Sequence, residues 1–259
     1  MLILLSPAKK IAEFVEGEHV TMPYAEYVTA PLFQAYTVDL IKILQCKTAF
    51  ELAGLMHLSS TLALLNYERF QKFFSASAHH YPALFLFQGD VYKALKAKEW
   101  DEETVLYAQL HLRILSGLYG ILKPLTLIEP YRLEMGTPLA TVSCKNLYQY
   151  WSKLVTDELN NILIAMHYPV IINLASVEYS KVIDRKQLNF PVINIHFKQE
   201  KNGQLKSIGI YAKKARGAMA NYLMKNKIEN IEGIKQFTEL NYSYYHHLSD
   251  EFNLVFVMV

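Results

Sequence analysis

Residues 2–5 read Leu-Ile-Leu-Leu, an apolar run that ends directly in Ser6-Pro7. Four consecutive apolar residues closed by a turn signal predict a short buried strand. A Lys-Asn-Gly-Gln segment at residues 201–204 predicts a hairpin turn between two later strands. Further apolar runs predict strands over residues 83–87, 170–174, 192–197, 207–211 and 254–257.

The remaining periodic segments favour helices, because their apolar residues recur on one face of a 3.6-residue period. Thr48 and Glu51 have the spacing of a capping box that opens one of these helices. Helices predominate early and strands cluster from about residue 170, which favours a mixed α+β fold over regularly alternating α/β units. We expect a single compact domain over residues 1–259, with a mixed sheet flanked by helices. The other predicted helices cover residues 31–44, 60–74, 101–115, 145–166 and 212–226.

The composition excludes several classes of protein. Hydrophobic residues make up 52% of the chain and charged residues 19%, so the sequence is neither disordered nor of low complexity. The two cysteines, Cys46 and Cys144, form no CxxC motif, which argues against a disulfide scaffold and favours a cytoplasmic location. The N-terminal apolar run is too short for a signal peptide and no stretch approaches a membrane span, so we expect no membrane partner.

The net charge of +2 excludes a uniformly basic nucleic-acid binder but conceals an uneven distribution. Residues 201–228 contain seven Lys and Arg and no acidic residue, and the remaining residues carry 19 basic against 24 acidic side chains, a net charge of −5. Lys213, Lys214 and Arg216 fall in the expected first turn of the last long helix, where cations oppose the helix dipole and favour a bound anion. Neutralisation by internal carboxylates is the alternative.

A turn with two glycines, Leu115-Ser-Gly-Leu-Tyr-Gly120, follows the helix expected over residues 101–115. It is similar to the hairpin of helix-hairpin-helix DNA-binding elements, which contacts backbone phosphate without reading bases. The glycine spacing is one residue longer than usual and Pro124 limits any second helix, so an ordinary helix C-cap is the alternative. The residues that would contact DNA here are Arg113, Ser116, Gly117, Leu118, Tyr119, Gly120 and Lys123.

Six motifs occur in order along the chain. They are Ser6-Pro-Ala-Lys9, Phe87-Gln-Gly-Asp-Val-Tyr92, Leu115-Ser-Gly-Leu-Tyr-Gly120, Pro130-Tyr-Arg-Leu-Glu-Met-Gly136, Asn173-Leu-Ala-Ser-Val-Glu-Tyr179 and Tyr211-Ala-Lys-Lys-Ala-Arg-Gly217. Together they closely resemble the YaaA family of bacterial peroxide-stress resistance proteins, from the N-terminus to about Tyr245.

The resemblance implies a cytosolic protein made under hydrogen peroxide stress and linked to low unincorporated iron and limited oxidative DNA damage. It also implies a compact domain of unusual topology with a positively charged cleft, a helix-hairpin-helix-like element and DNA binding. The motifs dictate no reaction, so catalysis stays open, and they imply no cofactor.

The motif residues place many polar side chains at strand ends and adjoining loops, where ligands usually bind. An internal ion network, an anion-binding cleft and a catalytic site all fit this pattern. The further expected DNA contacts are Lys9, Arg132, Lys213, Lys214 and Arg216. The polar residues of unassigned role are Asp90, Tyr92, Tyr131, Glu134, Asn173, Ser176, Glu178 and Tyr179.

No metal site is expected, because the nine histidines form no HExxH motif and no ligand spacing with Cys. The leading hypothesis is a stress protein that binds DNA largely independently of sequence, through a basic cleft. The alternative is an enzyme that acts on a small anionic or nucleotide-like metabolite in the same cleft.

Overall fold

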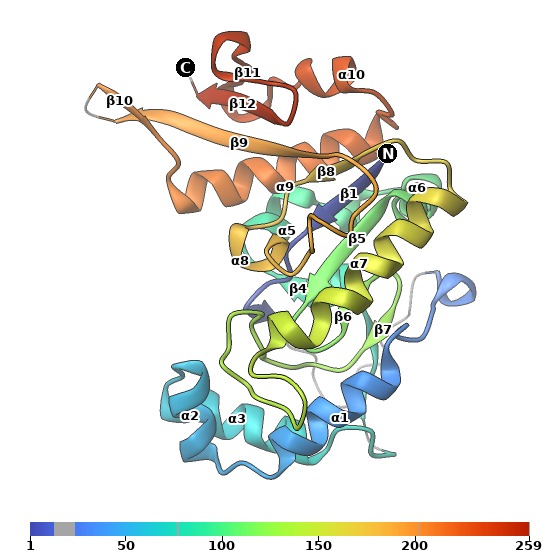
Figure 1. The fold of residues 1–259 in the computed structure, drawn as a ribbon, viewed down its shortest axis with the longest axis vertical. Coiled ribbons are helices and arrows are strands. Elements are labelled where there is room, and N and C mark those ends of the chain that lie inside the picture. The colour runs from blue at the N-terminus through green and yellow to red at the C-terminus, as the bar shows by residue number, and fades with distance from the viewer. Residues whose placement is uncertain (13–23, 77, 202, 259) are drawn as a thin grey trace.

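The computed structural model describes residues 1–12, 24–76, 78–201 and 203–258, and a mixed eight-stranded sheet lies at its centre (Figure 1). The strands run in the order β11 (Tyr242–Tyr244), β12 (Asn253–Met258), β9 (Val192–Lys201), β8 (Ile171–Asn173), β1 (Leu2–Leu5), β5 (Leu112–Ser116) and β6 (Gly120–Leu122), and β10 (Gln204–Lys206) pairs with β9. The five adjacent strands from β12 to β5 are mutually parallel, whereas β6, β10 and β11 pair antiparallel with their neighbours. Two short pairs lie outside this sheet, β2 (Lys10–Ile11) with β4 (Phe87–Gln88) and β3 (Tyr81–Pro82) with β7 (Leu127–Ile128).

Helices flank the sheet, which confirms the predicted mixed architecture, and three of them gather at the end of the molecule away from β9 and β10 (Figure 1). These three are α1 (Gln34–Gln45), α2 (Ala49–Met56) and α3 (Ser60–Gln71). The others are α4 (Ala83–Leu86), α5 (Asp90–Leu95), α6 (Glu102–His111), α7 (Leu147–Ala165), α8 (Val177–Ser180), α9 (Gly209–Lys225) and α10 (Ile231–Lys235). Single 3-10 turns occur at Ala25–Tyr27, Ala97–Glu99, Glu239–Asn241 and His246–Leu248.

Side-chain caps explain where several helices begin. The Thr48 hydroxyl accepts a hydrogen bond from the Glu51 N–H, and the Glu51 carboxylate accepts one from the Thr48 N–H at 2.7 Å, so the predicted capping box is present. Asp101 caps α6 and Asn146 caps α7 in the same way, through the N–H groups three residues on.

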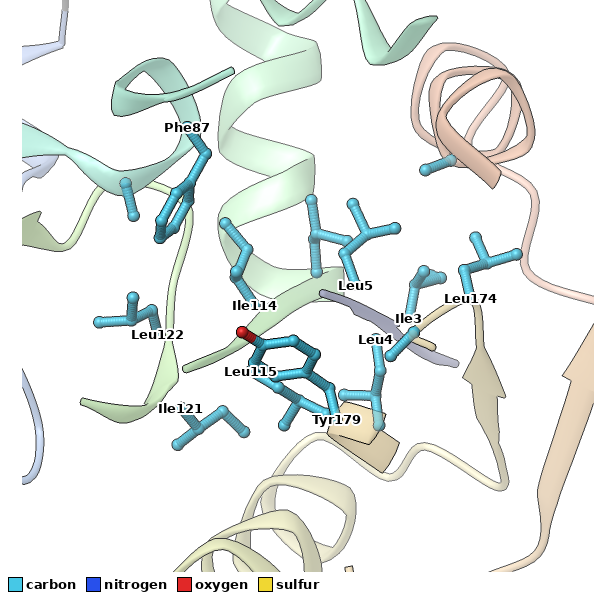
Figure 2. Packing of buried hydrophobic residues seen from close by; sticks show 14 of the residues in the cluster. Ile3, Leu4, Leu5, Phe87, Ile114, Leu115, Ile121, Leu122, Leu174 and Tyr179 are labelled. Atoms are coloured by element: carbon cyan, nitrogen blue, oxygen red, sulfur yellow. The ribbon is translucent and has the colours of Figure 1, made fainter. Parts of the chain in front are cut away.

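Strand β1 forms the centre of the hydrophobic core. Ile3, Leu4 and Leu5 are fully buried, because β5 and β8 pair with both edges of the strand and side chains cover both of its faces. Figure 2 shows Leu5 close to Ile114 of the neighbouring strand β5. The short buried strand predicted over residues 2–5 is confirmed.

The strand predicted over residues 83–87 is wrong. Residues Ala83–Leu86 form the single-turn helix α4, and only Phe87–Gln88 and Tyr81–Pro82 on either side of it are extended. A short apolar run that is buried on all sides has no period that separates a strand from a helix, so its neighbours decide.

The helix predicted over residues 101–115 is also wrong at its end, because α6 stops at His111 and strand β5 begins at Leu112. The guanidinium of Arg113 folds back and donates to the carbonyl groups of Gln109 and Leu112 at 3.0 and 2.7 Å, which caps the end of α6. β5 then pairs with β1 and turns into the antiparallel β6. The turn at residues 115–120 therefore joins two strands, and the expected helix-hairpin-helix element is absent from this described segment.

The segment predicted as a strand over residues 207–211 belongs mostly to α9, which begins at Gly209. The extended part ends earlier, at Lys206 in β10, and the β9–β10 hairpin confirms the turn predicted at residues 201–204, although Asn202 lies outside the described residues. Because α9 begins earlier than predicted, Lys213, Lys214 and Arg216 lie beyond its first turn. The helix dipole therefore does not explain their position, since its effect fades after that turn.

Helices α5 and α9 pack at very close range around Gly217. A Cβ atom built there would lie 2.0 Å from the carbonyl oxygen of Val91, so only glycine allows this approach. The contact sets the distance between α5 and α9, each of which contributes residues to the pocket described below.

We expect Gly217→Ala to lower the free energy of unfolding by about 1–3 kcal/mol, because the added methyl group forces α5 and α9 apart. Gly54→Ala in α2 is the matched control: a Cβ there meets no atom within 4 Å, so the better helix propensity of alanine should raise stability by up to about 1 kcal/mol. Urea denaturation measures both. Equal effects of the two substitutions would contradict the close α5–α9 contact.

Candidate functional site

The segments that follow β1 and β8 meet at one edge of the sheet. Because these strands are parallel and adjacent, their carboxyl ends lie together, which is where open α/β sheets usually bind ligands. The Ser6 hydroxyl lies 3.2 Å from that of Ser176 and accepts a hydrogen bond from the Ser176 N–H at 2.8 Å. The hydroxyl of the buried Tyr92 donates to the Ser6 carbonyl at 3.0 Å and holds the segment after β1 in place.

A pocket of about 320 Å³ opens at this edge, between the two segments and helices α5 and α9. Apolar side chains such as Pro7, Val91 and Leu174 form part of its wall. It brings together seven of the predicted site residues: Lys9, Asp90, Ser176, Glu178, Tyr179, Lys213 and Arg216. The pocket thus draws these residues from the segments after β1 and β8 and from helices α5 and α9.

An ion network adjoins the pocket at Lys9, whereas its other members, Arg132 and Glu134, do not line the pocket. The Glu134 carboxylate pairs with Lys9 Nζ at 2.5 Å and with Arg132 Nη2 at 2.7 Å. Burial alone would raise the pKa of Glu134, but the hydrogen bonds from Lys9 and Arg132 outweigh it and hold the pKa below its ordinary value. For these two cations the alternative of an ion network is present in part: both pair with Glu134, and the three side chains together keep a net charge of +1.

Arg216 and Lys213 are different. Arg216 forms no ion pair or hydrogen bond with any described residue, and its Nε atom is buried without a partner. Burial lowers the pKa of this guanidinium, the direction expected when no carboxylate offsets desolvation. Lys213 is exposed and likewise lacks an acidic partner within 4 Å in the described part of the chain. One half-buried and one exposed cation are thus available to an anion in the pocket.

The pocket also contains carboxylates. Glu178 accepts a hydrogen bond from the Gly136 N–H at 3.1 Å, which holds its side chain in place. Asp90, at the start of α5, forms no side-chain hydrogen bond or ion pair with the described residues. The pocket therefore combines unpaired positive groups with one unpaired acceptor.

Tyr92, Tyr131 and Asn173 are also polar motif residues, but they are buried and do not line the pocket. Tyr131 is buried and its hydroxyl lies 2.6 Å from that of Ser116. Burial raises the pKa of Tyr92, Tyr131 and Tyr179, so these phenols remain protonated at neutral pH. Asn173 donates to Asn194 and accepts from the Ala175 N–H, which shapes the turn after β8.

The hairpin residues expected to contact DNA are buried, which corrects that assignment. The Ser116 hydroxyl accepts hydrogen bonds from the N–H groups of Leu118 and Tyr119, and Trp151 donates to the Gly117 carbonyl at 2.9 Å. A Cβ on Gly117 would lie 2.5 Å from the Leu133 carbonyl oxygen. The groups that would bind phosphate are thus used internally, and Gly120, with φ of +72°, closes the turn against Trp151.

Three expected cationic contacts lie elsewhere. Arg113 and Lys123 line a second, smaller cavity of about 150 Å³ together with Glu158, and burial lowers the pKa of Arg113 to about 10. Lys214 is exposed on α9 but does not line the first pocket. None of these three residues lines the pocket that contains Arg216.

Sequence reasoning did not single out Ser6, Lys10 or Gln88, although all three line the pocket. Ser6 and Gln88 belong to two of the six motifs. The position of Ser6 directly after a buried strand could have indicated a residue of the site. Lys10 belongs to a two-residue strand that pairs with Gln88, a long-range contact without a local pattern.

The described residues contain neither a cluster of metal ligands nor a membrane-spanning helix. No group of three or more His, Cys, Asp or Glu side chains there is arranged to hold a metal ion. No helix in the described segments has both the length and the apolar character needed to cross a bilayer.

Comparison with known proteins identifies the family. A sequence model described as peroxide stress protein YaaA matches residues 1–248. The chain belongs to this family. A UPF0246 protein of Legionella pneumophila (strain Lens) is 50% identical over 262 aligned positions, covering 100% of both chains. UPF0246 proteins of Crocosphaera subtropica and Caulobacter vibrioides (strain NA1000) are 42% and 43% identical over 99% of this chain and 100% and 98% of theirs.

Membership confirms the resemblance drawn from the six motifs, and it supports a role in peroxide stress for this YaaA-family chain. The motifs after β1 and β8 and the one in α9 supply the pocket, whereas the motif at residues 115–120 supplies a buried hairpin. The motifs of the family thus serve both the pocket and its support.

Glu134→Gln should lower the free energy of unfolding at pH 7 by about 1–3 kcal/mol, because Lys9 and Arg132 lose their shared charged acceptor. Since the folded pKa lies below the ordinary value of 4.5, this stabilisation is present above pH 4.5 and is lost as the pH falls through the folded pKa. Urea denaturation from pH 7 to pH 3 should show the two proteins converging in acid.

Glu178→Gln is the matched control for this substitution. Its amide oxygen can still accept the Gly136 N–H, so we expect little change in stability. A constant difference between wild type and Glu134→Gln across the pH range would contradict the network.

Proposed function

We propose that this YaaA-family protein acts in peroxide stress by binding DNA through backbone phosphates, largely independently of sequence, at the mouth of the pocket beside β1 and β8. The observation that carries the proposal is the unpaired state of Arg216 and Lys213 on one wall of that pocket. Unpaired Lys and Arg are the groups that release counterions from DNA and supply sequence-independent affinity.

The surroundings of the pocket support this proposal. Lys10 is exposed at the pocket wall and extends the positive surface there. Lys9 and Arg132 contribute less, because both already pair with Glu134. The phosphate contacts thus come from α9 and the segment after β1, and the buried hairpin at residues 115–120 has no part in them.

Limiting oxidative damage to DNA would follow from such binding. The lowering of unincorporated iron is carried over from the family to this chain as part of the proposal, and no residue of the pocket is assigned to it.

Binding to a fluorescent DNA duplex should weaken steeply with salt, with a log–log slope of about −0.9 for each phosphate contacted. Lys213→Ala/Arg216→Ala should weaken binding to duplexes of different sequence equally and reduce the slope by about 2. Fluorescence anisotropy from 50 to 300 mM salt measures both effects.

Lys153→Ala/Lys186→Ala is the charge-matched control, since both lysines are exposed and neither lines the pocket. This variant should bind DNA as wild type does. Absence of binding at low salt, or equal losses in the two double variants, would overturn the proposed interface.

The unpaired Asp90 favours a second candidate, an enzyme that acts on a small anionic metabolite in the same pocket. A DNA backbone needs only cations, whereas a carboxylate can accept or transfer a proton. Asp90→Asn should then abolish protection against hydrogen peroxide in cells while leaving DNA affinity unchanged or higher. The exposed Asp39→Asn serves as control, and full protection by Asp90→Asn would remove this candidate.

A further inference from the structure

We infer that the pocket holds one nucleoside 5′-monophosphate unit, with its phosphate on Arg216 and Lys213 of α9. The source is either a free mononucleotide or a nucleotide unit of a DNA strand. The second source rests on the proposed DNA binding, whereas the first does not.

The size of the pocket favours a small ligand. A volume of about 320 Å³ falls at the lower end of the range of small-molecule sites. A duplex backbone that contacts the mouth of the pocket would leave this volume unfilled. The pocket is therefore suited to one nucleotide unit rather than to a length of helix.

The cations of α9 define where the phosphate binds. The Nε–H of Arg216 is buried without an acceptor, and an unsatisfied buried donor is unfavourable unless a ligand supplies one. A phosphate oxygen is a suitable acceptor for a guanidinium, and Lys213 adds a second charge on the same helix. Ion pairs with described residues do not compete for either group.

The other walls argue against a bare anion. Asp90 carries an unpaired carboxylate, an acceptor that a phosphate dianion cannot satisfy but that a hydroxyl or amino group of a larger ligand can. Gln88 and Ser176 add further hydrogen-bonding groups, and Pro7, Val91 and Leu174 add apolar surface. An anionic end, neutral donors and a flat apolar body together describe a nucleotide.

Isothermal titration calorimetry with AMP, GMP, CMP and UMP tests the inference, with adenosine and inorganic phosphate as the two partial ligands. At least one monophosphate should bind ten times more tightly than either partial ligand. Lys213→Met and Arg216→Met should each weaken it at least tenfold, and Lys214→Met, which changes a neighbouring lysine outside the pocket, should not.

Lys213 is exposed, so its variant should fold even if Arg216→Met does not, and thermal unfolding checks both. If no monophosphate binds more tightly than phosphate, or if Lys213→Met and Lys214→Met behave alike, the inference is wrong even when DNA binds. If a monophosphate binds and DNA does not, the proposed function fails and the inference stands for a free nucleotide.

A competition experiment separates the two sources. The tightest monophosphate is added at saturation to the complex with a fluorescent single-stranded oligonucleotide. Displacement supports a strand-borne nucleotide in the pocket, and simultaneous binding supports a free nucleotide.

Discussion

The parallel pairing of β1 with β5 on one side and β8 on the other is the constraint on which the rest of the structure depends. It buries four consecutive apolar residues completely and brings the ends of strands that are 168 residues apart in sequence to one edge, where Leu5 and Asn173 end their strands. The polar groups of the pocket come from that edge, from helices α5 and α9, and from the short β2–β4 pair. Ligands usually bind outside the carboxyl ends of parallel strands, where the connections of neighbouring strands diverge.

Some cations in or beside the pocket pair with a carboxylate of the protein, and others remain free to bind a ligand. Glu134 pairs with both Lys9 and Arg132 and so connects the segment after β1 to residues 130–136. Arg216 has no such partner, although it is more deeply placed than Lys9. A cation left unpaired while carboxylates lie in the same pocket is costly to the fold alone, and this is what makes it informative about a ligand.

The hairpin at residues 115–120 shows how a motif can serve a site without touching its ligand. Its N–H groups bond to Ser116, and its backbone lies against that of residues 133–134, which carry the ion network. The Ser116 hydroxyl also forms a hydrogen bond of 2.6 Å with the Tyr131 hydroxyl. The small residue at Gly117 is thus required by close packing behind the pocket rather than by contact with phosphate.

Local sequence features were enough to predict the buried strand at residues 2–5, the capping box at Thr48 and the β9–β10 hairpin, because caps, turns and short apolar runs involve neighbouring residues. Tertiary contacts decided that residues 112–116 pair with β1, that α9 begins at Gly209, and that Lys9, Asp90, Ser176 and Arg216 line one pocket. They also decided that Glu134 pairs with Lys9 and Arg132 but not with Arg216. Strand pairing and ion pairing involve residues that are distant in the chain, so the local periodicity of the sequence does not predict them.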